Sequence, residues 1–566
     1  MTSLVPLPVI LPLLGTGATL MLFRFPRAQR IVSALVLTAV VVVAAVLLVS
    51  VDRDGTQVVW LGGWEGLGIA LVADRLAVLM LLVSAVVTLA VLLYSIGQGI
   101  TGDERETPVS IYHPTFLTLV AGVSNAFLAG DLFNLFVSFE MLLFSSYVLL
   151  TLGGTAARVR AGTIYVVVNV VSSMLFLIAL ATTYAAVGTL NLAQVAERLD
   201  GLPPSVALMI QLLLLVTFAI KAAVFPLSLW LPDSYPTAPA PVTAVFAGLL
   251  TKVGVYAIIR TQTLLFPDSP LSTLLMVAAL LTMVIGILGA IAQSDIKRML
   301  SFTLVSHIGY MIFGVGLATE AGTGGAVFYV AHHITIQTAL FLVVGLIERR
   351  AGSTALLRLG GLARLSPLLG VLFFVPAMNL AGIPPMSGFL GKVDLFQAGV
   401  AQGSPLALVL VAGGTLTSLL TLYAVAKTWA LAFWRSPQQA HDMARLLVGH
   451  GEEDRREQDE QAVPAMVEHR GHVHVGSVAF GAADLDEARQ VADADAPDRD
   501  LHQLIEAGAL PDRLPLLMVL PTAGLVLASL AITVVAGPLV GYTDRAAADL
   551  TDRDSYVGAV MDGVPR

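Results

Sequence analysis

Four charged side chains lie within long apolar segments of this chain, namely Glu140, Lys221, Lys252 and Lys392. A charge at the centre of a bilayer costs at least about 2.5–3.5 kcal/mol, so such residues are retained chiefly where they serve a function. Burial opposes the ionised form of a carboxylate or a lysine, whereas an opposite charge within about 4–6 Å favours it. If Glu140 and Lys221 are buried side by side, each would therefore change between its charged and its neutral form readily. Such a pair is suited to moving protons. Two alternatives are a static buried salt bridge and lysines that extend their ammonium groups to the membrane surface.

Three histidines, His307, His332 and His333, lie in apolar segments between Lys252 and Lys392. An imidazole with a reference pKa of about 6.5 both accepts and donates a proton near neutral pH. Three of them on adjoining helices predict a relay linked by water. The alternative for each one is a packing residue held by hydrogen bonds.

Prolines interrupt the segments that carry two of the lysines. Pro226 follows Lys221, and Pro384 and Pro385 precede Lys392. Non-helical backbone is tolerated at membrane depth only where protein or a water-filled cavity satisfies its polar groups. The sequence therefore predicts broken helices beside a hydrated cavity.

The composition is that of a membrane protein that crosses the bilayer many times. The 566 residues are 57% hydrophobic and 12% charged, and the mean hydropathy is +0.85. The absence of cysteine excludes disulfides, thiolate-held iron–sulfur clusters and a catalytic thiol. A net charge of −8 provides no basic surface for nucleic acid. We expect residues 1–22 to form a first spanning helix, because no basic region precedes this apolar stretch.

Fourteen apolar stretches approach the length of about 20 residues that spans a bilayer, and they predict an all-α polytopic fold. Helices four to eight and nine to thirteen form two repeats of five helices. Because five is an odd number, the second repeat would enter the membrane with the opposite topology to the first. The spacing from Glu140 to Lys221 is 81 residues and that from His307 to Lys392 is 85. The predicted stretches are 4–22, 31–51, 76–98, 112–130, 132–152, 163–188, 205–225, 237–260, 270–292, 300–318, 325–347, 366–398, 405–434 and 514–541.

Lysine and arginine in the short loops predict the orientation. They gather on one side of the alternating spans, which should be cytoplasmic, so both termini should lie outside. The predicted organisation is residues 1–111 as N-terminal transmembrane helices, 112–260 as the first repeat, 270–435 as the second, 436–512 as an acidic, histidine-containing cytoplasmic loop, 513–541 as the last transmembrane helix and 542–566 as a polar, exposed tail.

The loop 436–512 holds six of the ten histidines, including the run HRGHVH at 469–474. Closely spaced histidines are able to chelate a metal. No second ligand cluster at fixed spacing accompanies them, so we expect a solvated insertion and no metal site.

The motifs around the charged residues are similar to those of the antiporter-like membrane subunits of proton-pumping complexes, and most closely to the family of D-type subunits in Mrp-type sodium/proton antiporters. The resemblance covers roughly residues 1–435. It is most specific in LFNLFVSFEMLL around Glu140, FAIKAAVFPLSLWLPDSYPTAPAPVTAVFAGLLTKVGVYAIIR around Lys221 and Lys252, and GIPPMSGFLGK ending at Lys392.

The resemblance implies a role for each residue. Glu140 and Lys221 would be the ion pair of a first half-channel, Lys252 would link it to central relay histidines His307 and His333, and Lys392 would lie on the exit side. It also implies several other small membrane subunits as partners, no bound cofactor, and a transporter rather than an enzyme. Some relatives carry a lysine where this chain has Gln337, and the loop 436–512 is longer than the family pattern.

Three hypotheses remain open from the sequence. The first is a proton-translocating subunit of a sodium/proton antiporter in the cell membrane. The second is a proton-pumping subunit of respiratory NADH dehydrogenase, which shares the architecture but takes its energy from redox chemistry. The third is an assembly scaffold without transport activity.

Overall fold

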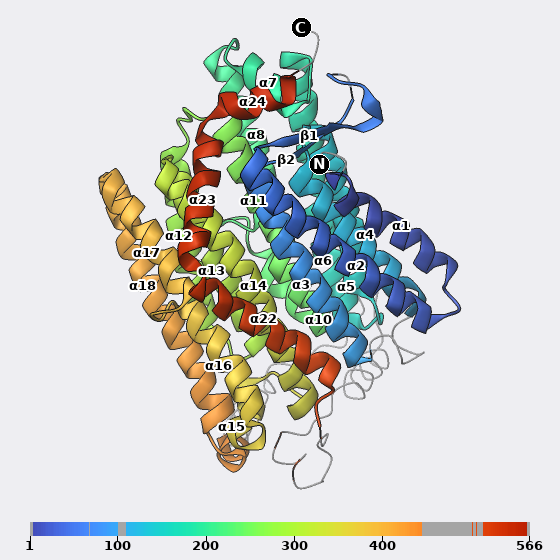
Figure 1. The fold of residues 1–566 in the computed structure, drawn as a ribbon. Helices are drawn as coiled ribbons and strands as arrows, with labels where there is room; N and C mark the ends of the chain where they lie inside the picture. Colours follow the sequence, from blue (N-terminus) through green and yellow to red (C-terminus); the bar gives the residue numbers. More distant parts are fainter. Residues whose placement is uncertain are drawn as a thin grey trace, which may run out of the picture.

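The structure is a computed structural model that describes residues 4–66, 68–99, 109–443, 501, 505 and 513–562. Long helices run roughly along one direction and form a single bundle (Figure 1). Within these residues, eleven helices are long and apolar enough to cross a membrane. The three remaining predicted spans fall on α1, on α4 and on the pair α16 and α17.

The first part of the bundle contains the elements up to residue 264. They are α1 (Leu7–Met21), α2 (Pro26–Asp54), β1 (Gln57–Trp60), β2 (Ala70–Ala73), α3 (Arg75–Gln98), α4 (Val109–Leu128), α5 (Leu132–Thr151), α6 (Ala156–Val187), α7 (Leu192–Leu199), α8 (Pro204–Ala222), α9 (Trp230–Ser234), α10 (Ala240–Val245), the π-helical turn η4 (Phe246–Leu250) and α11 (Thr251–Leu264).

The second part follows after a short connection. It contains α12 (Ser272–Ala292), α13 (Ile296–Gly316), α14 (Glu320–Ala351), α15 (Leu362–Leu365), α16 (Pro367–Ala381), α17 (Ser387–Gln402), α18 (Pro405–Thr428), the π-helical turn η6 (Trp429–Trp434), α22 (Leu516–Val534), α23 (Ala536–Thr551) and α24 (Arg553–Met561).

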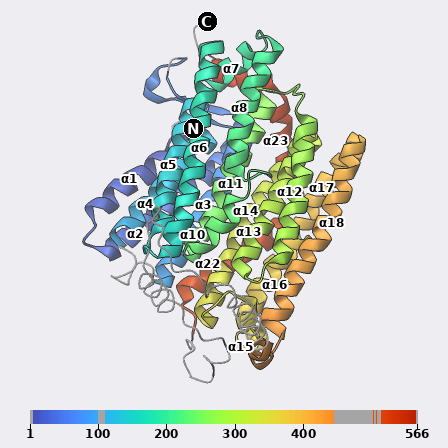
Figure 2. The same cartoon turned by 180° about the vertical axis from the view of Figure 1, so that it is seen from behind.

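Two spans form the centre of the molecule. The most apolar windows of Ala240–Leu264 and Glu320–Ala351 are completely buried, whereas the corresponding window of α2 is 28% buried. Seen from behind, α6, α8 and α12 cover this centre (Figure 2). The two central spans carry Lys252, His332 and His333, so packing alone removes these three residues from solvent and lipid.

Short polar residues set where several helices begin. Asp74 accepts a hydrogen bond from the main-chain N–H of Ala77 at the start of α3, and Asp131 accepts from Phe133 and Asn134 at the start of α5. Such caps satisfy N–H groups that have no partner within the helix. They fix where α3 and α5 begin, and the cap by Asp131 thereby sets the start of the helix that carries Glu140.

Both predicted helix breaks lie where the prolines stand. Helix α8 ends at Ala222, the next residue is left-handed with φ 58°, and Pro226 follows in the turn that leads to α9. In the second part, α16 ends at Ala381, and Pro384 and Pro385 occupy the break before α17.

A β-hairpin that the sequence analysis missed joins α2 to α3. Strands β1 and β2 pair antiparallel, with Gln57 opposite Ala73. The hairpin lies near α7 and α24 at one end of the molecule, which we call the hairpin end (Figure 1). The opposite end, which contains α15, is called the α15 end.

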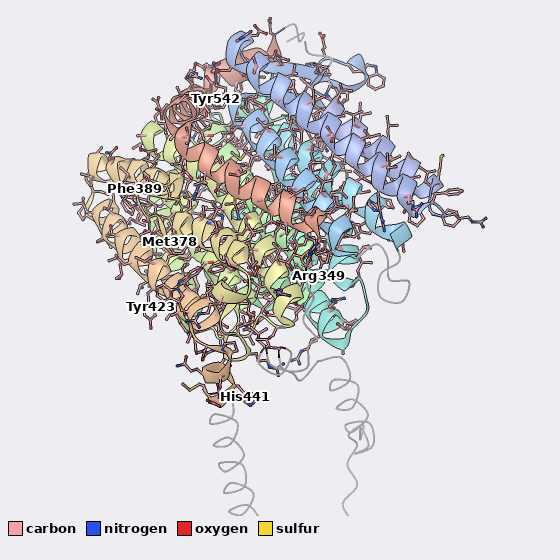
Figure 3. The ribbon with its side chains drawn as sticks, turned by 60° about the horizontal axis from the view of Figure 1, so that its bottom comes forward. Arg349, Met378, Phe389, Tyr423, His441 and Tyr542 are labelled. Carbon is pink, nitrogen blue, oxygen red and sulfur yellow. The ribbon has the colours of Figure 1, made fainter. Side chains whose placement is uncertain are left out.

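The prediction of an exposed C-terminal tail is wrong. Residues 536–561 form α23 and α24, and the last spanning helix, α22, already ends at Val534. Tyr542, Ala546 and Leu550 are buried at a helical spacing of four residues, so one face of α23 packs on the bundle. Tyr542 and His441 lie at opposite ends of the molecule (Figure 3). Of the predicted loop 436–512, only residues 436–443, 501 and 505 are described, and the histidine run at 469–474 lies outside the described residues.

Candidate functional site

Lys221 lies in the last turn of α8 and is 4% exposed. Its Nζ donates to Ser173 Oγ at 3.2 Å and to the main-chain oxygen of Asn169 at 3.4 Å, both on α6. The ammonium also lies 5.7 Å from the centre of the Phe139 ring. These partners are typical of a cation that has been desolvated and supplied with several weak ligands.

Glu140, on α5, is half-buried, and its Oε1 accepts a hydrogen bond from Ser173 Oγ. Glu140 and Lys221 do not form the direct ion pair that the sequence analysis expected, since the ion pairs of the described chain do not include them. Ser173 instead hydrogen-bonds to both groups. One hydroxyl with a single proton and two lone pairs is able to satisfy the two at once.

Lys252 is completely buried near the start of α11, and its Nζ donates to the main-chain oxygen of Ala247 at 2.6 Å. That oxygen belongs to the π-helical turn η4, where the hydrogen-bond register of the helix changes. Gly254 lies two residues after Lys252, and a Cβ atom on it would lie 2.7 Å from the main-chain nitrogen of Ala222. Helices α11 and α8 therefore touch through their backbones beside the two lysines.

His307 and His333 face each other between α13 and α14. Their ring centres lie 5.1 Å apart, and the Tyr329 hydroxyl is 2.8 Å from His307 Nδ1. Within the described chain, His307 Nε2 and both ring nitrogens of His333 are buried and make no hydrogen bond to protein. Buried polar atoms nearly always have a partner, which in a polar interior is commonly water.

His332 faces away from this pair, toward the second helix break. Its Nδ1 lies 3.0 Å from Ser387 Oγ, and Asn379 Nδ2 donates to the same Ser387 oxygen at 3.2 Å. Asn379 Oδ1 also accepts from the main-chain N–H of Gly388 at 2.8 Å. The break between α16 and α17 is thus joined to α14 through side-chain hydrogen bonds.

Lys392 lies in α17, beyond the break, and is 3% exposed. Its Nζ donates to the main-chain oxygens of Leu380 and Ala381, at 3.2 and 3.0 Å. These carbonyls end α16, where the helix dipole favours a cation. The ammonium is also 5.0 Å from the centre of the Tyr310 ring, which in turn lies 5.6 Å from the His307 ring.

The structure therefore brings the predicted residues into two groups. Glu140 and Lys221 share Ser173 in the first part of the chain, and His307, His332, His333 and Lys392 surround Tyr329 and Tyr310 in the second. Lys252 lies on α11, which contacts α8 on one side and α13 and α14 on the other.

Sequence reasoning missed Asn169 and Ser173, the two partners of Lys221 on α6. Asn169, Ser172 and Ser173 lie three and four residues apart in an apolar helix, and that spacing was a signal that one face of α6 is polar. Tyr329 offered no such signal, because a tyrosine among apolar residues is common.

A buried ion pair near the hairpin end was also missed. Arg260 Nη1 lies 2.6 Å from Asp74 Oδ2, and Nη2 donates to Asp74 Oδ1 at 2.8 Å. The guanidinium also faces the rings of Tyr256 and Tyr556. Because the guanidinium is held on several sides, this pair joins α3, α11 and α24.

No group of three or more histidine, cysteine, aspartate or glutamate side chains able to hold a metal is found among the described residues.

Comparison with known proteins gives the family. A model of the transmembrane region of the NADH:quinone oxidoreductase/Mrp antiporter family matches residues 129–421. The D-type subunit of the Na⁺/H⁺ antiporter of Alkalihalophilus pseudofirmus is 40% identical over 454 residues, which cover 79% of this chain and 90% of that protein. Its counterpart in Bacillus subtilis is 39% identical over 456 residues, with 79% and 91% covered.

Solved structures agree. A chain in the structure of the Mrp complex from Dietzia sp. superposes with a TM-score of 0.81 at 32% identity, covering 99% of this chain and 100% of that one. A chain of respiratory complex I from Thermus thermophilus gives a TM-score of 0.71 at 22% identity, covering 97% and 99%, and shows the shared fold alone. Together with its spanning helices, these matches show that the chain is a multi-pass membrane protein homologous to the D-type subunit of Na⁺/H⁺ antiporters, and that it belongs to the NADH:quinone oxidoreductase/Mrp antiporter family.

Proposed function

We propose that this chain is the proton-translocating subunit of a multisubunit Na⁺/H⁺ antiporter. Protons move along the buried axis from Glu140 through Lys221 and Lys252 to the histidines and Lys392. The observation that carries the proposal is this set of ionisable groups, in two clusters on helices that touch, buried beside two broken helices.

The hydration of the axis is part of the proposal. The unpaired ring nitrogens of His307, His332 and His333, and the unpaired amide oxygen of Gln337, support water in the interior of the described chain. Gln337 donates to the main-chain oxygen of Leu300 and does not titrate, so histidines and water make the central steps.

The proposal extends to the wider assembly. Fourteen spans, two inverted repeats of five helices, both termini outside, and neighbouring membrane subunits without bound cofactor complete the proposal. The runner-up, a proton-pumping subunit of NADH dehydrogenase, has a similar fold, but relatives about 40% identical over most of their length are antiporter subunits.

Lys221→Ala tests the proposal in the complete complex. We expect loss of Na⁺-driven proton exchange in everted membrane vesicles, with the complex assembled in normal amount. Exchange at the wild-type rate would favour the scaffold hypothesis and refute proton translocation through Lys221.

A further inference from the structure

The hydroxyl of Ser173 is the one protein group in the described chain that hydrogen-bonds to both Glu140 and Lys221. It donates to Glu140 Oε1, and it accepts from Lys221 Nζ at 3.2 Å. Ser173 is 8% exposed, so the bridge lies inside the bundle. The donor on one side and the acceptor on the other give the hydroxyl the polarity of a proton wire.

Other hydroxyl groups on the same helix behave differently. Thr163, Thr182 and Thr183 donate to main-chain oxygens four residues earlier in α6, at 2.8–2.9 Å. This local bond is the ordinary way for serine and threonine to satisfy a hydroxyl within a helix. Ser173 donates instead across to α5, and its neighbour Ser172 donates to the main-chain oxygen of Thr217 on α8 at 3.2 Å.

We propose that Ser173 is a proton-relay residue between Lys221 and Glu140. In the transfer, an N–H bond of the Lys221 ammonium breaks as the proton bonds to Ser173 Oγ. At the same time, the O–H bond of Ser173 breaks as its proton bonds to Glu140 Oε1. The lysine becomes a neutral amine, the serine is unchanged and the glutamate becomes a carboxylic acid, so one proton has moved. The reverse transfer breaks the O–H bond of the Glu140 carboxylic acid and forms an N–H bond on the Lys221 amine, and this is the direction in which the proposed axis runs.

The bridge also explains why the two charges are not in direct contact. A direct buried ion pair is held in its charged form and is costly to break. With the Ser173 hydroxyl between them, Glu140 and Lys221 each retain their proton affinity. A proton then passes between them in two short transfers. This inference rests on the proposed function, because a scaffold would have no use for the relay.

The test compares Ser173→Ala, Ser173→Thr and Ser172→Ala in the complete complex, with Na⁺-driven proton exchange measured in everted vesicles over a range of pH. Ser172→Ala is the matched control, since it removes a neighbouring buried hydroxyl that donates to the main-chain oxygen of Thr217. We expect Ser173→Ala to lower exchange by about 10²-fold, the low end for loss of a positioned proton-transfer group. It should also change the shape of the pH profile, and Ser173→Thr should restore both.

Three results would overturn the relay: a wild-type rate and pH profile in Ser173→Ala, an equal loss in Ser172→Ala and Ser173→Ala at every pH, or an assembled Ser173→Thr complex as inactive as Ser173→Ala. Lys221→Ala separates this inference from the proposed function. If Lys221→Ala abolishes exchange and Ser173→Ala does not, only the relay is wrong. If Lys221→Ala leaves exchange intact, the proposed function itself is wrong.

Discussion

Arg260 and Asp74 bury two opposite charges together, with side chains 4% and 5% exposed. Removing one partner of such a pair leaves an unpaired buried charge and costs about 3–5 kcal/mol. We expect Arg260→Ala to lower the melting temperature of the purified complex clearly, and the double variant Asp74→Asn with Arg260→Gln to lower it less. An equal effect of the two variants would show that the charges themselves are unimportant.

Tyr329 holds His307 through a hydrogen bond of 2.8 Å to Nδ1. Tyr329→Phe keeps the ring but leaves that nitrogen without its partner, a loss of about 1–3 kcal/mol. We expect normal assembly and an exchange rate lower by about tenfold, which corresponds to about 1.4 kcal/mol. Tyr94→Phe is the control, because within the described residues the Tyr94 hydroxyl binds only the main-chain oxygen of Leu342. Equal rates in the two variants would remove Tyr329 from the site.

The residues that the sequence revealed are those whose type is unusual in a membrane. Lys221, Lys252 and Lys392 stand out because a charge among apolar residues needs a reason. Ser173 and Tyr329 do not stand out, and their importance depends on which helices become neighbours. The bridge between Glu140 and Lys221 needs α5, α6 and α8 to meet, and no local pattern gives that distance.

At the level of helices, both broken spans place a lysine against the end of a helix. Lys221 lies in the last turn of α8, whereas Lys392 reaches back across the break to the final carbonyls of α16. The partial negative charge at a helix C-terminus stabilises a cation in either arrangement. The prolines predicted the breaks and the side on which each lysine lies, but the sequence did not show that Lys392 reaches back to the carbonyls that end α16.

Helix α23 shows where composition misled. It carries the charged residues Asp544, Arg545 and Asp549, yet its small and apolar residues recur on one face that packs against α14. Ala547 is completely buried and Ala548 is exposed, so they form a matched pair. We expect Ala547→Asp to reduce the amount of folded protein in the membrane, because a buried carboxylate without a partner costs several kcal/mol. Ala548→Asp should have no effect; equal amounts of both variants would mean that α23 is not docked.

We expect the stability of the fold to depend on pH through Asp131, at the start of α5. Burial raises the pKa of Asp131, and the main-chain N–H groups of Phe133 and Asn134 partly oppose this rise. The folded state therefore binds the proton more tightly than the unfolded state, and the stability from this group falls as pH rises above about 3.9. Asp131→Asn keeps the helix cap without the titration. Its melting temperature should exceed that of the wild type by more at neutral pH than at about pH 4, and a constant difference would contradict this account.

At the scale of the whole molecule, a network of ion pairs joins helices at the hairpin end. Arg75 binds Asp52 and Asp549, and Arg545 also binds Asp52, so α2, α3 and α23 are joined there. Eleven of the fourteen predicted stretches coincide, within the described residues, with helices long and apolar enough to cross a membrane, because a bilayer imposes that length. The hairpin and α23 were not predicted, because short or amphipathic elements are under no comparable constraint of length.

The orientation of the molecule can be tested because the chain contains no cysteine. Glu197, at the hairpin end, and Gln438, at the α15 end, are both exposed, so each is a suitable site for a single introduced cysteine. Arginine and lysine gather in the loops at the α15 end, which the positive-inside rule assigns to the cytoplasm. We expect a membrane-impermeant maleimide to label Glu197→Cys in intact cells and Gln438→Cys only in everted vesicles, with the cysteine-free protein unlabelled in both. The opposite pattern would invert the orientation, and with it the side from which protons reach Lys392.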